Sequence, residues 1–218
     1  GGTYYNTPGQ QTVFQNNTSL HVGRNTMVRG LEVNNAADPT GSLSGNGGHL
    51  HFNAPLVRVD GGINVSALGG RGAYTGNGGV VTVNAQYFYQ NGTITANGAR
   101  GGTLQFDVGT AVFTGNSITE ALGDGMGGGV ITLSGDDVVS IDRYAKLTTN
   151  GFTGLNFDNN VISIEGGLVN MQGILEANGI VANGVASDGG LVRLVARGGA
   201  DNSANDLINN SDLFTDSE

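Results

Sequence analysis

A repeat that opens on pairs of glycine residues constrains the fold of this chain more than any other feature. The pairs begin at Gly47, Gly78, Gly101, Gly128 and Gly189, and Asn159-Asn160 takes the same place once. Steps between successive pairs run from 23 residues (Gly78 to Gly101) to 31 residues (Gly47 to Gly78). Self-similarity at such a period is typical of architectures in which one short unit stacks on the next.

Two apolar positions follow each glycine pair and flank one polar residue. The first apolar positions are Leu50, Val81, Leu104, Ile131, Ile162 and Val192. The second are Phe52, Val83, Phe106, Leu133, Ile164 and Leu194. The polar residues between them are His51, Thr82, Gln105, Thr132, Ser163 and Arg193. Alternation with a period of two indicates a strand that has one face in a core and the other in water.

Further apolar runs complete each repeat. In residues 78–100, GGVVTVNAQYFYQNGTITANGAR, the runs at 81–83, 87–89 and 94–96 are separated by short polar corners that leave no room for a helix. The last run recurs at 65–69, 147–151 and 175–179 and ends at Gly, usually as Asn-Gly. Both residues tolerate positive φ, which suits a tight corner.

These patterns predict an all-β fold: a parallel β-helix (β-solenoid) with three short strands per rung and about six rungs. We expect residues 1–46 to form an N-terminal arm and irregular capping rungs, 47–199 the repeats, and 200–218 an acidic tail. The tail is either mobile or docks on this or a neighbouring subunit, and the insertion at 151–160 folds over a face. Besides the two apolar columns, the expected core contains Val65, Ala67, Ile94, Ala96, Leu147, Leu175 and Ala177.

Composition and charge narrow the classes of function. The net charge is −9, and 9 Lys and Arg residues supply no basic stripe of the kind that nucleic-acid binding requires. The same balance disfavours an anionic membrane surface, and no run approaches the roughly 18 apolar residues of a membrane helix. We therefore expect neither nucleic-acid partners nor membrane insertion. Cysteine is absent, so stability must come from stacking rather than from disulfides.

Histidine and aspartate offer candidate sites, each with a simpler structural explanation. His49 and His51 would share an outer strand face and could hold a metal, although His21 has no determined position beside them. Asp124, Asp136, Asp137 and Asp142 gather in sequence, as carboxylates do in β-helix lyases and hydrolases. However, the basic residues fall in different repeats: Arg71, Arg100, Arg143, Lys146, Arg193 and Arg197.

We accordingly predict no catalytic, cofactor-binding or metal-ligating residue and expect that the protein is not an enzyme. Calcium at the corner Gly123-Asp124-Gly125 is the one cofactor that the sequence leaves open, although calcium takes six to eight oxygen ligands.

An aromatic run and the polar column bear on ligand binding. Tyr87, Phe88 and Tyr89 are consecutive, so at least one ring must face outward, where it either packs under a loop or offers a platform for a sugar. The polar column from His51 to Arg193 is too mixed for the uniform threonine array that ice binding would require.

The segments NGGVVTVNAQYFYQNGTITANG (77–98), LVNMQGILEANG (168–179) and SDGGLVRLVA (187–196) resemble the repeats of filamentous-haemagglutinin-type exoproteins of two-partner secretion. The resemblance covers about residues 47–199 and implies a right-handed β-helix in a secreted adhesin or extracellular fibre. The secretion domain of that family carries Asn-Pro motifs, which this chain lacks. The chain would therefore be a passenger segment or a look-alike solenoid.

Three functions follow as hypotheses. The first is a non-enzymatic structural protein, extracellular or on a bacterial cell surface, that forms homo-oligomers or filaments through its ends, with residues 1–16 and the tail as arms. The second is an adhesin module that binds cell-surface glycans. The third, a polysaccharide lyase or hydrolase, is disfavoured because the basic residues do not accompany the acidic ones.

Overall fold

In the computed structural model, the described residues are 1–34, 43–152, 160–182, 184–198, 207–209 and 212–214. They form 22 strands and no helix, so the protein is all-β. None of these residues belongs to a helix that is long and apolar enough to cross a membrane. Part of the 151–160 insertion and most of the tail, about which we made predictions, lie outside the described residues.

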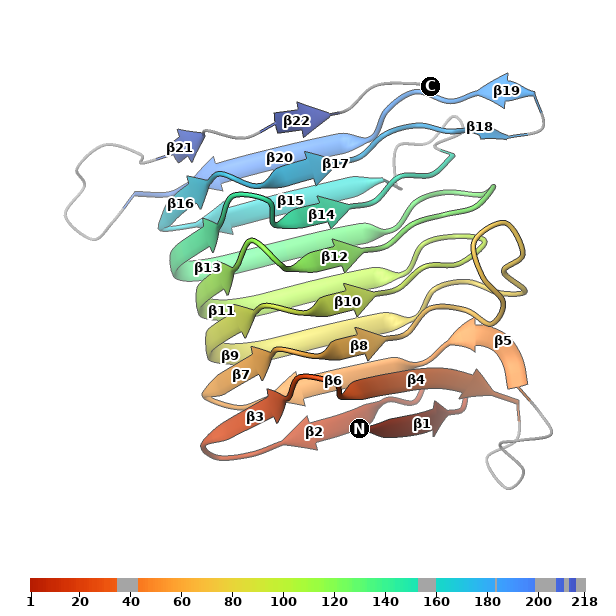
Figure 1. The fold of residues 1–218 in the computed structure, drawn as a ribbon, viewed down its shortest axis with the longest axis horizontal. Coiled ribbons are helices and arrows are strands. Elements are labelled where there is room, and N and C mark those ends of the chain that lie inside the picture. Colours follow the sequence, from red (N-terminus) through yellow and green to blue (C-terminus); the bar gives the residue numbers. More distant parts are fainter. Residues whose placement is uncertain (35–42, 153–159, 183, 199–206, 210–211, 215–218) are drawn as a thin grey trace.

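The strands form two large sheets that run along the whole molecule (Figure 1). The nine-stranded sheet has the order β1 (Gly2–Asn6), β4 (Met27–Val33), β8 (Gly62–Asn64), β10 (Thr93–Thr95), β12 (Ile118–Glu120), β14 (Lys146–Thr148), β17 (Ile174–Glu176) and β22 (Asp212–Phe214), with β5 (Leu43–Gly47) beside β4. All of its pairings are parallel except that of β4 with β5.

The eleven-stranded sheet is parallel throughout. Its order is β2 (Thr12–Gln15), β6 (His49–Asn53), β9 (Val80–Gln90), β11 (Thr103–Phe113), β13 (Val130–Ile141), β15 (Val161–Gly166) and β20 (Leu191–Ala196). Beside this path, β3 (Ser19–Val22) pairs with β7 (Leu56–Val59), β7 with β9, and β16 (Leu168–Met171) with β13 and β21 (Leu207–Asn209). A small antiparallel pair joins β18 (Val181–Ala182) to β19 (Val185–Ala186).

This arrangement corrects the predicted fold class. A right-handed parallel β-helix with three short strands per rung and about six rungs is wrong, because the strands form two large sheets and β9, β11 and β13 run for 11 or 12 residues without a break. The apolar runs 81–83 and 87–89 are not separate strands, since Asn84 and Ala85 between them pair with β11. The predicted irregular N-terminal cap is also wrong, because β1 to β4 pair in parallel with later strands.

The predicted apolar columns, by contrast, are confirmed. Leu50 pairs in register with Val81, which pairs with Leu104, and the series continues to Val192. All members are buried except Val192 and Leu194 on the last strand, which are partly buried. Parallel in-register stacking puts identical positions of successive repeats in line, so that one continuous apolar core runs between the sheets.

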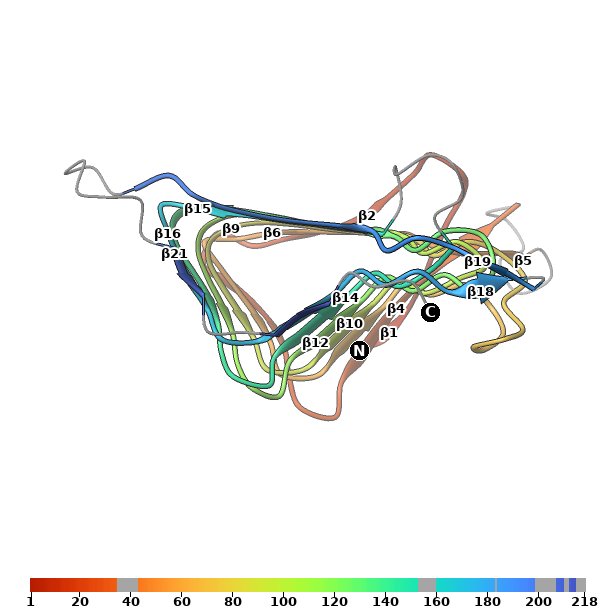
Figure 2. The ribbon, with the colours of Figure 1, turned by 90° about the horizontal axis from the view of Figure 1, so that it is seen from above.

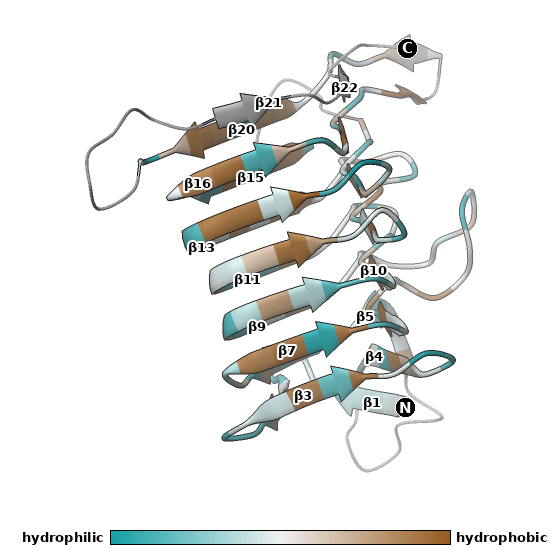
Figure 3. Cartoon of the chain, turned by 60° about the vertical axis from the view of Figure 1, so that its left-hand side comes forward, coloured by the Kyte–Doolittle hydropathy of each residue, from teal (hydrophilic) through white to brown (hydrophobic). Residues whose placement is uncertain are grey.

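The eleven-stranded sheet bends, so that β15 and β16 lie along different sides of the molecule (Figure 2). At the bend the inward positions change from Val81 and Val83 to Phe88 and Gln90 within the single strand β9. Phe88 contacts the rings of Phe106 and Phe113, with centroids 5.0 and 5.5 Å away. The outward positions that alternate with the buried ones are polar or partly exposed. Along β3 and β7 this alternation appears as bands of hydrophilic and hydrophobic residues (Figure 3).

The glycine pairs lie where the two sheets meet. Gly79 N–H donates to Val65 O, and Gly102 N–H donates to Ala96 O, both at 2.7 Å. A Cβ atom on Gly78 would collide with the carbonyl oxygen of Ala96. The sheets therefore touch backbone to backbone along this edge, and this contact explains the glycine repeat.

Candidate functional site

The N-terminal end of the molecule presents open strand edges. Among the described residues, β1, β2 and β3 each pair with a later strand on one side only. Tyr5 on β1 and Val13 on β2 are 40% and 48% exposed. These three strands contain no Lys, Arg, Asp, Glu or Pro, which are the residues that commonly protect an open edge from pairing.

The apolar core continues up to this end. The Phe14 ring stacks on Phe52 at a centroid distance of 4.8 Å, and Tyr4 meets Phe14 edge-on at the same distance. Tyr4, Phe14 and Leu20 are only partly buried. The N-terminal end thus combines unpaired backbone groups with incompletely covered apolar side chains.

The C-terminal end has the matching property. There β20, β21 and β22 are the last strands along the two sheets, each paired to an earlier strand on one side. Leu191 on β20 is 49% exposed, and Val192 and Leu194 are partly buried. Strands at both ends of both sheets therefore lack a partner on one edge within the described residues.

A ladder of side-chain acceptors follows the nine-stranded sheet just beyond its strands. The side chain in one repeat accepts the backbone N–H of the next: Asn97 N donates to Ser66 Oγ (3.0 Å), Leu122 N to Asn97 Oδ1 (2.8 Å), and Asn178 N to Asn150 Oδ1 (2.7 Å). At the C-terminal end of the ladder, Asn178 Oδ1 is buried and accepts no hydrogen bond from the described residues.

A patch of mixed chemistry lies on the bent side of the eleven-stranded sheet, over β3, β7 and β9. Leu56 lies opposite Tyr87, which is 52% exposed, and Arg58 lies opposite Tyr89. The Arg58 guanidinium carbon is 4.6 Å from the centroid of the Tyr89 ring. We call Leu56, Arg58, Tyr87 and Tyr89 the tyrosine patch.

Asp60 anchors the charged edge of the tyrosine patch. Arg58 donates from Nε to Asp60 Oδ2 (2.7 Å) and from Nη2 to Asp60 Oδ1 (3.1 Å), and His21 Nε2 lies 2.8 Å from Oδ2. The Arg58 hydrogen bonds, followed by that of His21, lower the pKa of Asp60 from 3.8 to about 2 despite an opposing effect of burial. The carboxylate therefore stays ionised at neutral pH and holds Arg58 against Tyr89.

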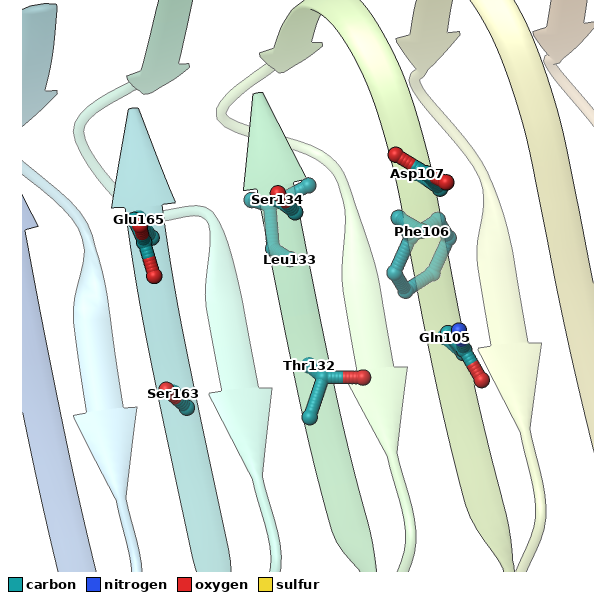
Figure 4. Close-up of a pocket in the computed structure, with 8 residues that line it drawn as sticks. All are labelled: Gln105, Phe106, Asp107, Thr132, Leu133, Ser134, Ser163 and Glu165. Atoms are coloured by element: carbon teal, nitrogen blue, oxygen red, sulfur yellow. The ribbon is translucent and has the colours of Figure 1, made fainter. Parts of the chain in front are cut away.

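A shallow groove of about 480 Å³ crosses the flat outer face of β11, β13 and β15 (Figure 4). Its polar lining side chains are Gln105, Asp107, Thr132, Ser134, Ser163 and Glu165. Glu165 pairs with Arg193 (3.5 Å) and Arg197 (3.2 Å). Asp107 stands two strands from Glu165 and, in the described part of the chain, forms no ion pair. The two carboxylates are thus not arranged as a close pair for acid–base chemistry.

The histidines that suggested a metal site are divided between two places. His49 and His51 lie on β6, where His51 Nδ1 makes a 2.6 Å hydrogen bond with Thr82 Oγ1, whereas His21 joins Asp60 on the bent side. Over the described ranges, no three His, Cys, Asp or Glu side chains gather as metal ligands would.

The four clustered aspartates are not brought together. Asp136 and Asp137 are exposed where β13 takes one residue more than β11, and Asp142 is exposed just after β13. Asp124 accepts a hydrogen bond from Gly72 N at a distant corner, which gives the calcium candidate a protein partner. This placement does not support the disfavoured lyase or hydrolase.

Sequence reasoning missed the Arg58–Asp60–His21 group because its members are up to 39 residues apart. The sequence held only a weak signal. Arg58 and Tyr89 occupy equivalent positions in successive repeats, so that stacking places a basic residue beside an aromatic one. The prediction that at least one ring of 87–89 faces outward is confirmed, since Phe88 is buried and Tyr87 is exposed.

No protein-family model, curated protein or solved structure matches this chain.

Proposed function

We propose that this protein is a non-enzymatic structural subunit that joins copies of itself end to end. The observation that carries the proposal is the pair of open ends, where both sheets stop at strand edges with apolar side chains such as Val13 and Leu191 partly in water. Unpaired edges of this kind pair readily with another chain.

The direction of the strands determines the geometry of such an assembly. Because neighbouring strands are parallel, a second copy continues the sheets in the same sense only when its N-terminal end meets the C-terminal end of the first. A head-to-tail contact uses two different surfaces and does not close on itself, so the product is an open filament.

An extracellular or bacterial cell-surface location is part of this proposal. It is supported by the absence of cysteine and by the resemblance of residues 77–98 and 168–196 to exoprotein repeats, which stays a prediction.

A concentration series tests the assembly. Val13→Lys places a charge on the open edge of β2 and should shift the distribution in sedimentation velocity toward the monomer. Thr82→Lys is the matched control, because Thr82 lies in the same outward column as Val13 but on the central strand β9. Monomers alone at every concentration of the unmodified chain would refute the proposal.

A second function, glycan binding by an adhesin module, is favoured by the tyrosine patch. An exposed aromatic ring offers an apolar face to the C–H groups of a sugar, and a fixed guanidinium next to it offers hydrogen bonds to hydroxyl groups. Tyr87 and Arg58 provide these two elements on adjacent strands.

A glycan array tests the second function. Tyr87→Ala should abolish any binding, whereas Tyr144→Ala, which removes a 68% exposed tyrosine outside the patch, should leave it unchanged. No bound glycan at high protein concentration, or equal loss in the two variants, would count against the patch as a sugar site.

A further inference from the structure

The corners that join the bent side to the nine-stranded sheet (Figure 1) differ in length. The last positions of the bent side pair in register in four successive repeats: Val22, Val59, Gln90 and Phe113. The first positions of the nine-stranded sheet do the same: Met27, Gly62, Thr93 and Ile118. The corners between them contain four residues at 23–26 and at 114–117 but only two at 60–61 and at 91–92.

The two short corners lie close against the preceding repeats. Gly61 N–H donates to Val22 O at 3.0 Å. Gly92 N–H donates to Val59 O at 3.1 Å. A Cβ atom on Gly92 would collide with the carbonyl oxygen of Gly61, so the close approach of these corners requires glycine.

The long corners on either side form walls. Because both ends of every corner are fixed in register, the additional residues of a long corner must project outward. Each long corner is closed by a turn hydrogen bond, from Thr26 N to Gly23 O (3.1 Å) and from Ser117 N to Thr114 O (2.9 Å). The space above the short corners is a groove of about 470 Å³, which we call the corner groove.

The corner groove is lined by polar side chains from all four corners and the strand that follows: Asn25, Thr26, Asp60, Asn91, Thr93 and Asn116. Met27, which is 48% exposed, adds an apolar side. Among these described residues Asp60 carries the one charge, and its carboxylate is already bound by Arg58. Amides and hydroxyls of this kind suit the hydroxyl groups of a sugar rather than an ion.

Asn91 provides a free donor in this lining. Its Oδ1 accepts from Thr114 Oγ1 (2.7 Å) and from Asn116 Nδ2 (3.3 Å). Its Nδ2 makes no hydrogen bond within the described part of the chain. Because the two bonds to Oδ1 fix the amide, Nδ2 is an oriented donor for a ligand in the corner groove.

The corner groove continues the tyrosine patch. Asn91 follows Tyr89 by two residues and Asp60 follows Arg58 by two, so the same two repeats form both surfaces. Tyr87 and Asn91 are four residues apart, or about 13 Å at the spacing of a strand. A single sugar ring, similar in size to the tyrosine ring, cannot contact both.

We propose that the corner groove is a second sugar subsite, so that the ligand is an oligosaccharide that runs from Tyr87 past Arg58 to Asn91. The inference rests on glycan binding by the tyrosine patch, the second function proposed above, and adds to it the class of glycan and the residues that bind its further units.

Isothermal titration calorimetry of the full chain tests the subsite with 1,4-linked gluco-, galacto- and manno-oligosaccharides, each from monosaccharide to tetrasaccharide. The unmodified chain should bind the tetrasaccharide of at least one series about tenfold more tightly than its monosaccharide. Asn91→Asp keeps an acceptor oxygen for Thr114 and removes the free donor. This variant and Asn116→Ala, at an exposed position, should lose the gain with chain length and leave the monosaccharide affinity unchanged.

Asn170→Ala is the matched control, because Asn170 also lies on the bent side, three strands from Tyr89 in the same column. It should preserve the gain. Monosaccharide binding through Tyr87 with no gain on lengthening, or a gain that survives both groove substitutions, would overturn the subsite and leave the tyrosine patch standing. Absence of binding in every series would overturn the glycan function and the subsite with it.

Discussion

Gln90 and Thr119 form a buried hydrogen bond, 3.0 Å from Nε2 to Oγ1, between two columns that are otherwise apolar. Gln90 occupies the place held by Val59 and Phe113 in neighbouring repeats, and Thr119 the place held by Ile94 and Leu147. Gln90 Nε2 also donates to the carbonyl oxygens of Gly92 and Ile118, both at 3.1 Å. The two polar residues therefore satisfy each other inside the core.

This pair should show strong energetic coupling. Gln90→Leu alone leaves the Thr119 hydroxyl buried without its partner and should cost about 1–3 kcal/mol of unfolding free energy. Thr119→Val in the same background should recover part of the loss, because both columns then become apolar. A double-mutant cycle by urea denaturation measures the coupling, and additive effects of the two substitutions would contradict this account.

The register of β9 predicts opposite outcomes for adjacent substitutions. Val83 is completely buried between Phe52 and Phe106, so Val83→Asp should prevent folding, since an unpaired charge cannot be held in an apolar core. Thr82 faces outward, and Thr82→Asp should change stability by less than about 1 kcal/mol. Thermal denaturation followed by circular dichroism compares them, and equal melting temperatures would refute the register.

Asn160 occupies a position that is glycine in most other repeats. We expect glycine to be tolerated there better than alanine. Its φ is 60°, its Oδ1 accepts from Gly128 N (2.6 Å), and its Nδ2 donates to Gly151 O (2.6 Å). Asn160→Gly loses the two hydrogen bonds, whereas Asn160→Ala also carries about 1 kcal/mol or more of left-handed backbone strain. Denaturant titration should rank the alanine variant lower, and the reverse order would show that strain is not what selects the residue.

The Arg58–Asp60 ion pair should make stability depend on acidity. Because the pKa of Asp60 is lowered to about 2 in the folded chain, from 3.8, its contribution is complete above about pH 4 and is lost as the pH falls toward 2. The urea midpoints of the unmodified chain and of Asp60→Asn should therefore converge as the pH falls from about 4 to about 2. A gap between the midpoints that does not change with pH would contradict the assigned pKa.

Part of this structure can be predicted from the local sequence pattern. The rest depends on tertiary contacts that leave no pattern in the sequence. The columns from Leu50 to Ile162 are readable because every repeat contributes the same alternation, and stacking requires it. The long strands are not, because Asn84 resembles a corner residue and belongs to a strand only through its pairing with Asn53 and Asp107 on the neighbouring strands. Gln90 likewise looks like a surface residue in the sequence, because its hydrogen-bond partner Thr119 lies 29 residues later in the chain.

The assembly surfaces show the same division. Open ends are expected of any stack of repeats, but the strands that form the N-terminal end could not be predicted. The regular pairing of β1 to β4 with later strands was hidden by their irregular spacing in the sequence.

Electron microscopy of the purified chain over a range of concentrations tests the central claim of end-to-end assembly most directly. The account predicts filaments with an axial repeat of about 34–38 Å, because the two sheets hold seven and eight strands along the stacking direction at about 4.8 Å each. Isolated particles at every concentration would contradict the claim that the open ends are the function of this protein.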